Sequence, residues 1–195
     1  MSGGWIAKEM CEQGFKVAVI ERGRKVTVEK DYTDFIDPWD AEHLNRKTDK
    51  DREDYPIQSN VYAFQSFTTQ FWVKDNDHPY ETADDSTFIW YRGYHEDGRS
   101  IMWGRQSYRM SEIDFEANAR DGHGVDWPVR YDDIKPWYDY VERFAGISGS
   151  MEGLDILPDG VFQPPHDLTC AELDFKSAVE GNFPGRRVIP GRVAN

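Results

Sequence analysis

The chain has 195 residues, enough for one large domain, or one and a half small ones, with a hydrophobic core. A formal net charge of −13 argues against nucleic acid as a partner, because a polyphosphate backbone would be repelled. Aromatic residues make up 14% of the chain, which argues against disorder. No stretch approaches the 18 apolar residues of a transmembrane segment. Cys11 and Cys170 form no CxxC pair, which disfavours a disulfide framework or a zinc site.

The first twenty residues have the pattern of half a βαβ unit. A helix is predicted over residues 2–14, because Ile6 and Met10 fall on one flank and Gly14 suits the position after the last turn. Residues 16–20 are a short run that is apolar on consecutive positions, as in a strand buried on both faces. We expect the first strand of the unit to lie upstream of this chain.

Gly3 and Glu21 stand 18 residues apart, which suits the third glycine and the ribose-binding acid of a dinucleotide fingerprint. Ser2, Gly3 and Gly4 would then open the helix whose free N–H groups bind a pyrophosphate, and Glu21 with Arg22 would lie at the ribose. A glycine-containing loop that caps an ordinary α/β helix explains these residues equally well.

The middle of the chain is less regular. Residues 24–54 are polar without a clear period, and residues 61–64 and 69–73 are candidate strands because they are rich in aromatic and β-branched side chains. A segment punctuated by glycine follows, from residue 92 to 105. His95 lies close to it and is expected to be an exposed loop residue.

Three helices are predicted after residue 110. Ser111 and Thr169 each begin a capping-box pattern, with an acid three residues later. Asp132 is the expected cap of a helix that ends near Gly146. A strand is predicted at residues 187–189. On the middle helix, Trp137 and Tyr138 are expected to lie on the buried face.

Four segments together resemble the glucose–methanol–choline (GMC) oxidoreductase superfamily, on its sugar- and gluconate-dehydrogenase-like branch. They are Met1-Ser2-Gly3-Gly4-Trp5 with Glu21-Arg22-Gly23, residues 98–107, Asp126-Trp127-Pro128-Val129 with Tyr131, and Leu157-Pro158-Asp159-Gly160. The resemblance implies an α/β protein with a partial Rossmann-like FAD-binding domain that lacks its first strand. Residues 1–30 would be the truncated helix–strand unit, and residues 31–90 an irregular aromatic-rich insertion. Residues 91–195 would hold the flavin-contacting loop and a helical part.

The block at residues 98–107 is the most specific part of this resemblance. The family's corresponding loop lies against the flavin, so Gly98 and Ser100 would face the flavin or its phosphates. Trp103 and Gly104 would lie near the isoalloxazine edge. Glycine at such a place lets the backbone approach a cofactor closely.

Two residues depart from the family pattern. Asp97 stands where members usually have a second glycine, and a carboxylate beside a pyrophosphate would be repulsive unless it points away. Met102 stands where some relatives carry the histidine that binds flavin covalently, so we expect the FAD to be non-covalent.

The implied activity is oxidation of a small-molecule alcohol or sugar at a CH–OH group, with hydride transfer to flavin N5. The family's catalytic histidine and its histidine or asparagine partner would lie beyond Asn195, so no catalytic residue is assigned. The resemblance also implies a possible electron-acceptor subunit as a partner. The compartment stays open. The isolated chain is expected to be marginally stable or prone to aggregation, and to bind FAD weakly or not at all.

Two other functions remain open. A fragment of an NAD(P)-dependent Rossmann dehydrogenase would explain the spacing from Gly3 to Glu21 but not the block at residues 98–107. A non-enzymatic carbohydrate-binding module would explain the many Trp and Tyr residues. The five histidines form no HExxH pattern, so no metal site is predicted.

Overall fold

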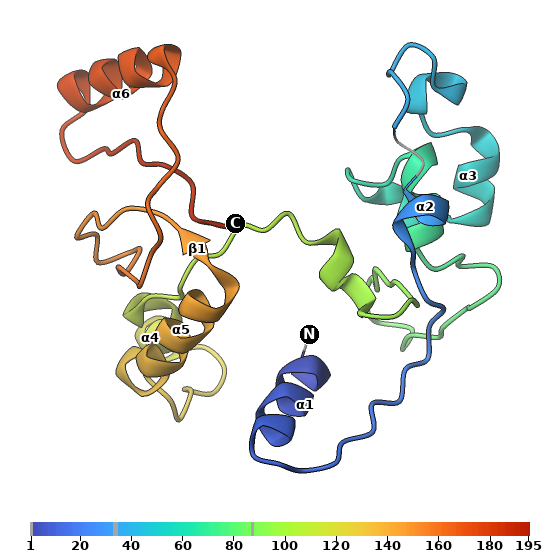
Figure 1. Cartoon of the computed structure of the whole chain (residues 1–195), viewed down its shortest axis with the longest axis horizontal. Coiled ribbons are helices and arrows are strands. Elements are labelled where there is room, and N and C mark those ends of the chain that lie inside the picture. Colours follow the sequence, from blue (N-terminus) through green and yellow to red (C-terminus); the bar gives the residue numbers. More distant parts are fainter. Residues whose placement is uncertain (1, 33–34, 87) are drawn as a thin grey trace. The chain divides into compact units, whose positions relative to one another are not determined.

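The computed structural model describes residues 2–32, 35–86 and 88–195. It divides into two compact units, Met1–Trp103 and Gly104–Asn195 (Figure 1). The boundary falls inside the glycine–tryptophan block that the sequence singled out. Met1 itself, which begins the first predicted motif, lies outside the described residues.

The first unit consists of short helices joined by irregular segments. Its α-helices are α1 (Ser2–Glu12), α2 (Val28–Asp31) and α3 (Asp49–Asp54). Its 3₁₀ helices are η1 (Glu42–Asn45), η2 (Gln58–Asn60), η3 (Ser66–Phe71) and η4 (Gly98–Met102). The predicted first helix is confirmed with its end at Glu12, and Gly14 adopts φ of +87° just beyond it.

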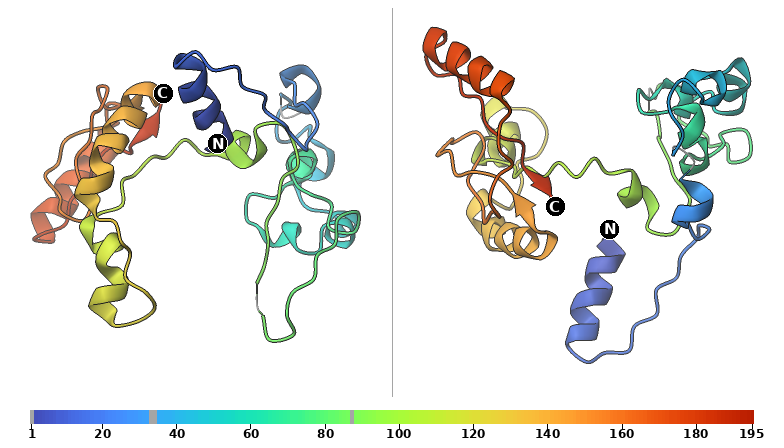
Figure 2. Two further views of the ribbon diagram at one scale, coloured as in Figure 1. Left: turned by 90° about the horizontal axis from the view of Figure 1, so that it is seen from below. Right: turned by 45° about the horizontal axis from the view of Figure 1, so that its top comes forward.

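The strand predicted at residues 16–20 is wrong for this structure. The extended segment that follows α1 runs without a neighbouring strand in the views of Figures 1 and 2, and Ile20 is 97% exposed. A strand is stabilised by ladder hydrogen bonds to a neighbour, and the described residues provide none here. An apolar run alone therefore did not suffice to form a strand.

The candidate strands at residues 61–64 and 69–73 are also wrong. Phe71, Trp72 and Val73 are buried on consecutive positions at the end of η3, and Phe64 is fully buried against the ring of Trp72. These side chains fill a small core from irregular backbone, so they do not alternate between two faces as in a half-buried strand.

A buried polar cluster lies beside this core. The Asp75 carboxylate accepts hydrogen bonds from the backbone N–H groups of Ile57 and Gln58 and from the Gln58 side-chain amide. Gln58 in turn accepts from the backbone N–H of Arg92 and donates to the Trp90 carbonyl. These bonds satisfy groups that would otherwise be costly to bury, and they fix the segment leading to His95.

The second unit contains the longer helices and a small sheet. Its helices are α4 (Glu112–Asp121), α5 (Tyr131–Ala145) and α6 (Cys170–Asn182). Strand β1 (Ile147–Ser148) pairs antiparallel with β2 (Val193–Ala194), with Ile147 opposite Ala194. Figure 1 shows β1 between α6 and the α4–α5 pair.

Two of the three predicted helix starts are confirmed. The Asp114 carboxylate accepts from the Ser111 N–H at 2.6 Å, and Glu172 accepts from the Thr169 N–H at 2.7 Å. The cap predicted at Asp132 is wrong, because the N-cap of α5 is Arg130, two residues earlier, and Asp132 lies inside the first turn of the helix. The predicted end is confirmed, with Gly146 in the left-handed conformation.

Two further expectations for this unit fail. Trp137 is 65% exposed, so it does not lie on a buried face of α5. No strand forms at residues 187–189, because the Val188 N–H donates to Glu180 and its carbonyl accepts from Lys176, both on α6. The described chain is thus a mixed protein, mainly helical, with a two-stranded sheet. Among its described helices, none is long and apolar enough to cross a membrane.

Candidate cofactor-binding region

Two segments that the sequence predicted to bind one cofactor meet in the first unit. Arg24 forms an isolated parallel bridge with His95, and the Glu96 N–H donates to the Arg24 carbonyl at 2.8 Å. Gly23 lies so close that a Cβ on it would overlap backbone atoms of His95. The motif Glu21-Arg22-Gly23 is therefore placed beside the segment that leads into the Gly98 block.

His95 is the buried centre of this junction, which we define as residues 21–24 and 93–98. It is only 2% exposed, so its expected place in an exposed loop is wrong. Its Nε2 lies 3.2 Å from the Phe71 carbonyl oxygen, which can only accept, so Nε2 carries the hydrogen. Its Nδ1 has no hydrogen-bond partner among the described residues. The ring anchors the junction to the core of the unit.

Glu21 and Arg22 lie on the surface of the junction. One carboxylate oxygen of Glu21, Oε1, accepts from the N–H groups of Arg22 at 2.7 Å and Gly23 at 3.3 Å. Its Oε2 has no partner in the described part of the chain and is open to an external donor. The Arg22 guanidinium lies over the ring of Tyr94, with 3.9 Å between its carbon and the ring centre.

The Gly98 block forms the 3₁₀ helix η4. Asp97 and Gly98 both have positive φ, +68° and +55°, and the Gly98 N–H donates to the His95 carbonyl at 2.8 Å. A second glycine would suit the left-handed position of Asp97, and aspartate is among the few other residues that adopt it readily. The Ser100 hydroxyl donates to the Asp97 carbonyl. The departure from the family pattern is therefore compatible with the turn.

The remaining predicted site residues are exposed. Ser2, Gly3 and Gly4 form the first turn of α1, where backbone N–H groups are left without helical partners. No described atom lies within 4 Å of a Cβ built on either glycine. Trp103 is 40% exposed at the end of η4, and Gly104 is the exposed first residue of the second unit.

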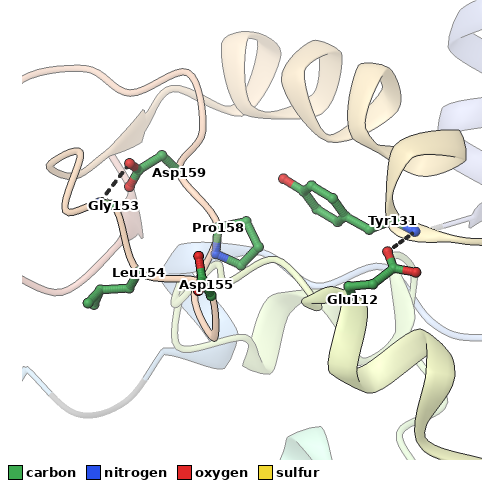
Figure 3. A pocket seen from close by; sticks show the side chains of 7 residues that line it. All are labelled: Glu112, Tyr131, Gly153, Leu154, Asp155, Pro158 and Asp159. Atoms are coloured by element: carbon green, nitrogen blue, oxygen red, sulfur yellow. Dashed lines mark hydrogen bonds between the residues drawn. The ribbon is translucent and has the colours of Figure 1, made fainter.

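The second unit has an acidic pocket of about 450 Å³ (Figure 3). In it, Glu112 accepts from the Tyr131 N–H at 3.0 Å, and Asp159 accepts from the Gly153 N–H at 2.9 Å. Both carboxylates thus support the pocket wall through the backbone. Its lining residues are Glu112, Tyr131, Gly153, Leu154, Asp155, Pro158 and Asp159.

A buried ion pair that contacts Tyr131, one of the residues lining this pocket, was not predicted from the sequence. Arg109 is 4% exposed and donates to both carboxylate oxygens of Glu142, to Asp139 and to the Tyr131 hydroxyl. Burial opposes its charge, but these hydrogen bonds outweigh burial and raise the pKa of Arg109. The spacing of Asp139 and Glu142 places both acids on one helix face, which was the available signal. That spacing did not indicate which basic residue pairs with them.

Buried side chains also hold the Leu157-Pro158-Asp159-Gly160 segment in place. Arg192, which is 1% exposed, donates to the carbonyls of Leu157 and Pro158 and pairs with Asp159 at 3.2 Å. A Cβ at Gly160 would overlap the Glu142 carboxylate. Burial lowers the pKa of Arg192, and nearby carboxylates oppose that effect. The segment is therefore fixed on one side by Arg192 and on the other by Glu142, the partner of Arg109.

The described residues hold no group of three or more His, Cys, Asp or Glu side chains placed to bind a metal ion.

No model of a known protein family matches the chain. Three curated proteins are similar to parts of this chain. Paromamine 6'-oxidase of Streptomyces fradiae is 32% identical over 77 residues, which is 38% of this chain and 13% of that protein. The fructose dehydrogenase large subunit of Gluconobacter japonicus is 24% identical over 179 residues, 89% of this chain and 30% of that protein.

A third relative, 2-methyl-1,2-propanediol dehydrogenase of Mycolicibacterium austroafricanum, is 23% identical over 174 residues, 84% of this chain and 26% of that protein. The chain is similar to oxidoreductases. It spans less than a third of the length of these relatives. An oxidase and two dehydrogenases agree with the class of protein that the sequence resemblance implied.

Proposed function

We propose that this chain supplies part of the FAD-binding region of a larger GMC-type enzyme, which oxidises an alcohol or a sugar at a CH–OH group. The observation that carries the proposal is the junction between Gly23 and His95. It places the predicted ribose-binding motif and the start of the predicted flavin loop side by side. The names of the relatives, and the small share of each that the chain covers, support the same proposal.

The residues at the junction fit an adenine dinucleotide. The Oε2 atom of Glu21 can accept hydrogen bonds from ribose hydroxyls, since it has no partner among the described residues. No described atom lies within 4 Å of a Cβ built on Gly98, so a flavin or phosphate could approach the backbone there. Asp97 leaves the turn intact and is exposed, so its carboxylate can remain in solvent.

Each residue would have a distinct part in binding. The N–H groups at Ser2, Gly3 and Gly4 would donate to the pyrophosphate at the positive end of α1. Glu21 would orient the ribose, and Ser100 and Trp103 would lie along the flavin. Bound FAD would supply the acceptor for the electron pair removed with the substrate hydrogen. With Met102 at the position of covalent attachment in some relatives, the FAD would be non-covalent.

An electron-acceptor subunit is part of the proposal. One relative is named as the large subunit of fructose dehydrogenase, a name that implies smaller partners for that protein. We propose a comparable partner here, to which reduced flavin would pass electrons.

The proposal is tested on the protein purified from cells that carry its complete gene. Denaturation in acid should release a flavin with the mass of FAD. Addition of alcohols and sugars without oxygen should bleach the flavin absorbance with at least one of them. A protein without flavin that reduces NAD or NADP would instead support the nicotinamide alternative. Sugar binding with neither cofactor would support the carbohydrate-binding module.

A further inference from the structure

The chain contains three steps at which an aspartate is followed by a glycine. They are Asp97-Gly98, Asp121-Gly122 and Asp159-Gly160. At such a step the backbone nitrogen of the glycine can attack the carboxyl carbon of the aspartate, because glycine has no side chain to hinder the approach. The surroundings of the three steps differ, so the fold decides which of them reacts.

The step at Asp159 is protected by its partners. Its carboxylate accepts from two backbone N–H groups of the preceding loop, at 2.8 and 2.9 Å, and pairs with the buried Arg192 at 3.2 Å. Gly160 packs against the Glu142 carboxylate, so the step has no room to turn. Reaction here would first have to break several charge-assisted hydrogen bonds.

The step at Asp121 is protected by its helix. Asp121 is the last residue of α4, and the Gly122 N–H donates to the Asn118 carbonyl at 3.0 Å. The His123 N–H donates to the same carbonyl at 3.2 Å. The carboxyl carbon can reach the glycine nitrogen only after this peptide turns, which requires the end of the helix to open.

The step at Asp97 is held least firmly. Asp97 is exposed, and within the described ranges its carboxylate forms no hydrogen bond or ion pair. Its φ of +68° is costly for a residue with a side chain. A Cβ on Gly98 would meet no described atom within 4 Å, so the peptide has room to turn. The Gly98 N–H donates to the His95 carbonyl at 2.8 Å, a bond of one short turn that opens locally.

We propose that Asp97-Gly98 is a site of spontaneous isoaspartate formation. The Gly98 nitrogen bonds to Cγ of the protonated Asp97 carboxyl group, whose hydroxyl leaves with the amide hydrogen as water. A second water molecule then adds to the main-chain carbonyl carbon of the cyclic imide and breaks its bond to the Gly98 nitrogen. The main chain now runs through Cγ, and the former carbonyl is a carboxylate. The mass is unchanged, and water is the only co-reactant.

The product should loosen η4. The Asp97 carbonyl accepts from the Ser100 N–H at 3.3 Å and from the Ser100 hydroxyl at 2.8 Å, and these bonds close the first turn of η4. Isomerisation removes this carbonyl from the main chain and lengthens the chain by one carbon. The inference does not rest on the proposed function. It concerns this chain in particular, because the family it resembles usually has glycine at the position of Asp97.

The test ages the protein purified from cells with its complete gene, in neutral buffer with and without urea. Trypsin places the three steps in separate peptides, residues 93–99, 121–130 and 144–176. Each is compared by liquid chromatography with a synthetic peptide that carries isoaspartate at that step. In the folded protein we expect about tenfold more isoaspartate in 93–99 than in 144–176, with less in 121–130 than in 93–99. In urea the three steps should react to similar extents.

Two variants test the local cause and its consequence. Ser100→Ala removes the hydroxyl bond to the Asp97 carbonyl, so isomerisation in peptide 93–99 should be about threefold faster. Ser107→Ala is the matched control, because it removes a similar bond to the Arg105 carbonyl and should leave that rate unchanged. Ageing should also speed hydrogen exchange at the Ser100 amide, but not in Asp97→Gly, which suits the left-handed turn and lacks the reacting carboxyl.

The folded protein decides the outcome. The inference would be overturned if peptide 93–99 held no more isoaspartate than 144–176, or less than 121–130. It would also be overturned if the Ser100 amide exchanged equally fast before and after ageing.

Discussion

Gly23 lies directly against the backbone of His95, so closely that any side chain at position 23 would overlap the His95 main-chain atoms. The bridge between Arg24 and His95 and the hydrogen bond from Glu96 to Arg24 continue the same contact. Two segments far apart in the sequence are thereby joined at one surface. The proposed cofactor region depends on this contact.

Replacing Gly23 by alanine should separate the two segments. The added methyl meets backbone atoms that cannot rotate away, so we expect a loss of about 1–3 kcal/mol in the free energy of unfolding, or more. Urea unfolding gives the change in stability, and hydrogen exchange at the Glu96 amide reports the junction itself. Gly3→Ala is the control, because no described atom lies within 4 Å of its added Cβ. An unchanged exchange rate at Glu96 in Gly23→Ala would show that the close approach is not needed.

Glu142→Gln should destabilise the second unit strongly. The change leaves the buried Arg109 with a weaker partner for two of its hydrogen bonds. Breaking a buried pair on one side costs about 3–5 kcal/mol in comparable proteins. Glu116→Gln, which breaks an i,i+4 pair with Arg120 on the surface of α4, should cost no more than about 0.5 kcal/mol. Similar urea midpoints for the two variants would contradict the importance of the Arg109 network.

The stability of α6 should fall in acid. Hydrogen bonds from Thr169 lower the pKa of Glu172 below its ordinary value of 4.5. The Val188 N–H, with Lys176 and Arg187, lowers that of Glu180 from the same value. The unfolded chain then binds protons more readily than the folded one, so this stability is present above pH 4.5 and is lost as the pH falls through the lower folded values.

Circular dichroism in urea, at a series of pH values, measures this dependence. A Glu172→Gln, Glu180→Gln double variant should lose less stability between about pH 6 and pH 3 than the unaltered chain, because neither amide titrates. Glutamine can still serve in a capping box, so the helix should form at neutral pH. If the free energy of unfolding changed equally with pH in the two proteins, Glu172 and Glu180 would not be the carboxylates responsible.

The exposed apolar run after α1 should promote aggregation of the isolated chain. Ile20 is 97% exposed, so Ile20→Lys should change the free energy of unfolding by no more than about 0.5 kcal/mol and should raise solubility. Ile147→Lys is the contrasting variant, because Ile147 is 2% exposed and its replacement should unfold the second unit. Light scattering and urea unfolding distinguish the two effects. Loss of folding in Ile20→Lys would mean that residue 20 is buried.

The sequence was most informative where local hydrogen bonds decide the structure. The starts of α4 and α6 followed from Ser111 and Thr169, and the end of α5 followed from Gly146, because caps are set within a few residues. Patterns that need a distant partner were less reliable. Residues 16–20 form no strand without a neighbour, and Trp137 is exposed despite its apolar spacing on α5.

In the candidate site, too, local motifs could be predicted from the sequence but contacts between distant segments could not. The sequence proposed Glu21 and Gly98 from glycine spacing and resemblance, but it gave no reason to place Gly23 against His95. That contact depends on the path of the chain between residues 24 and 95, including the polar cluster around Asp75 and Gln58. The Arg109–Glu142 pair likewise joins residues whose spacing carries no local signal.

The flavin content of the protein purified from cells with its complete gene tests the central claim most directly. We predict stoichiometric FAD that is released without breaking a covalent bond and is bleached by an alcohol or sugar in the absence of oxygen. A correctly folded, active protein that contains no flavin and needs a nicotinamide cofactor would contradict it.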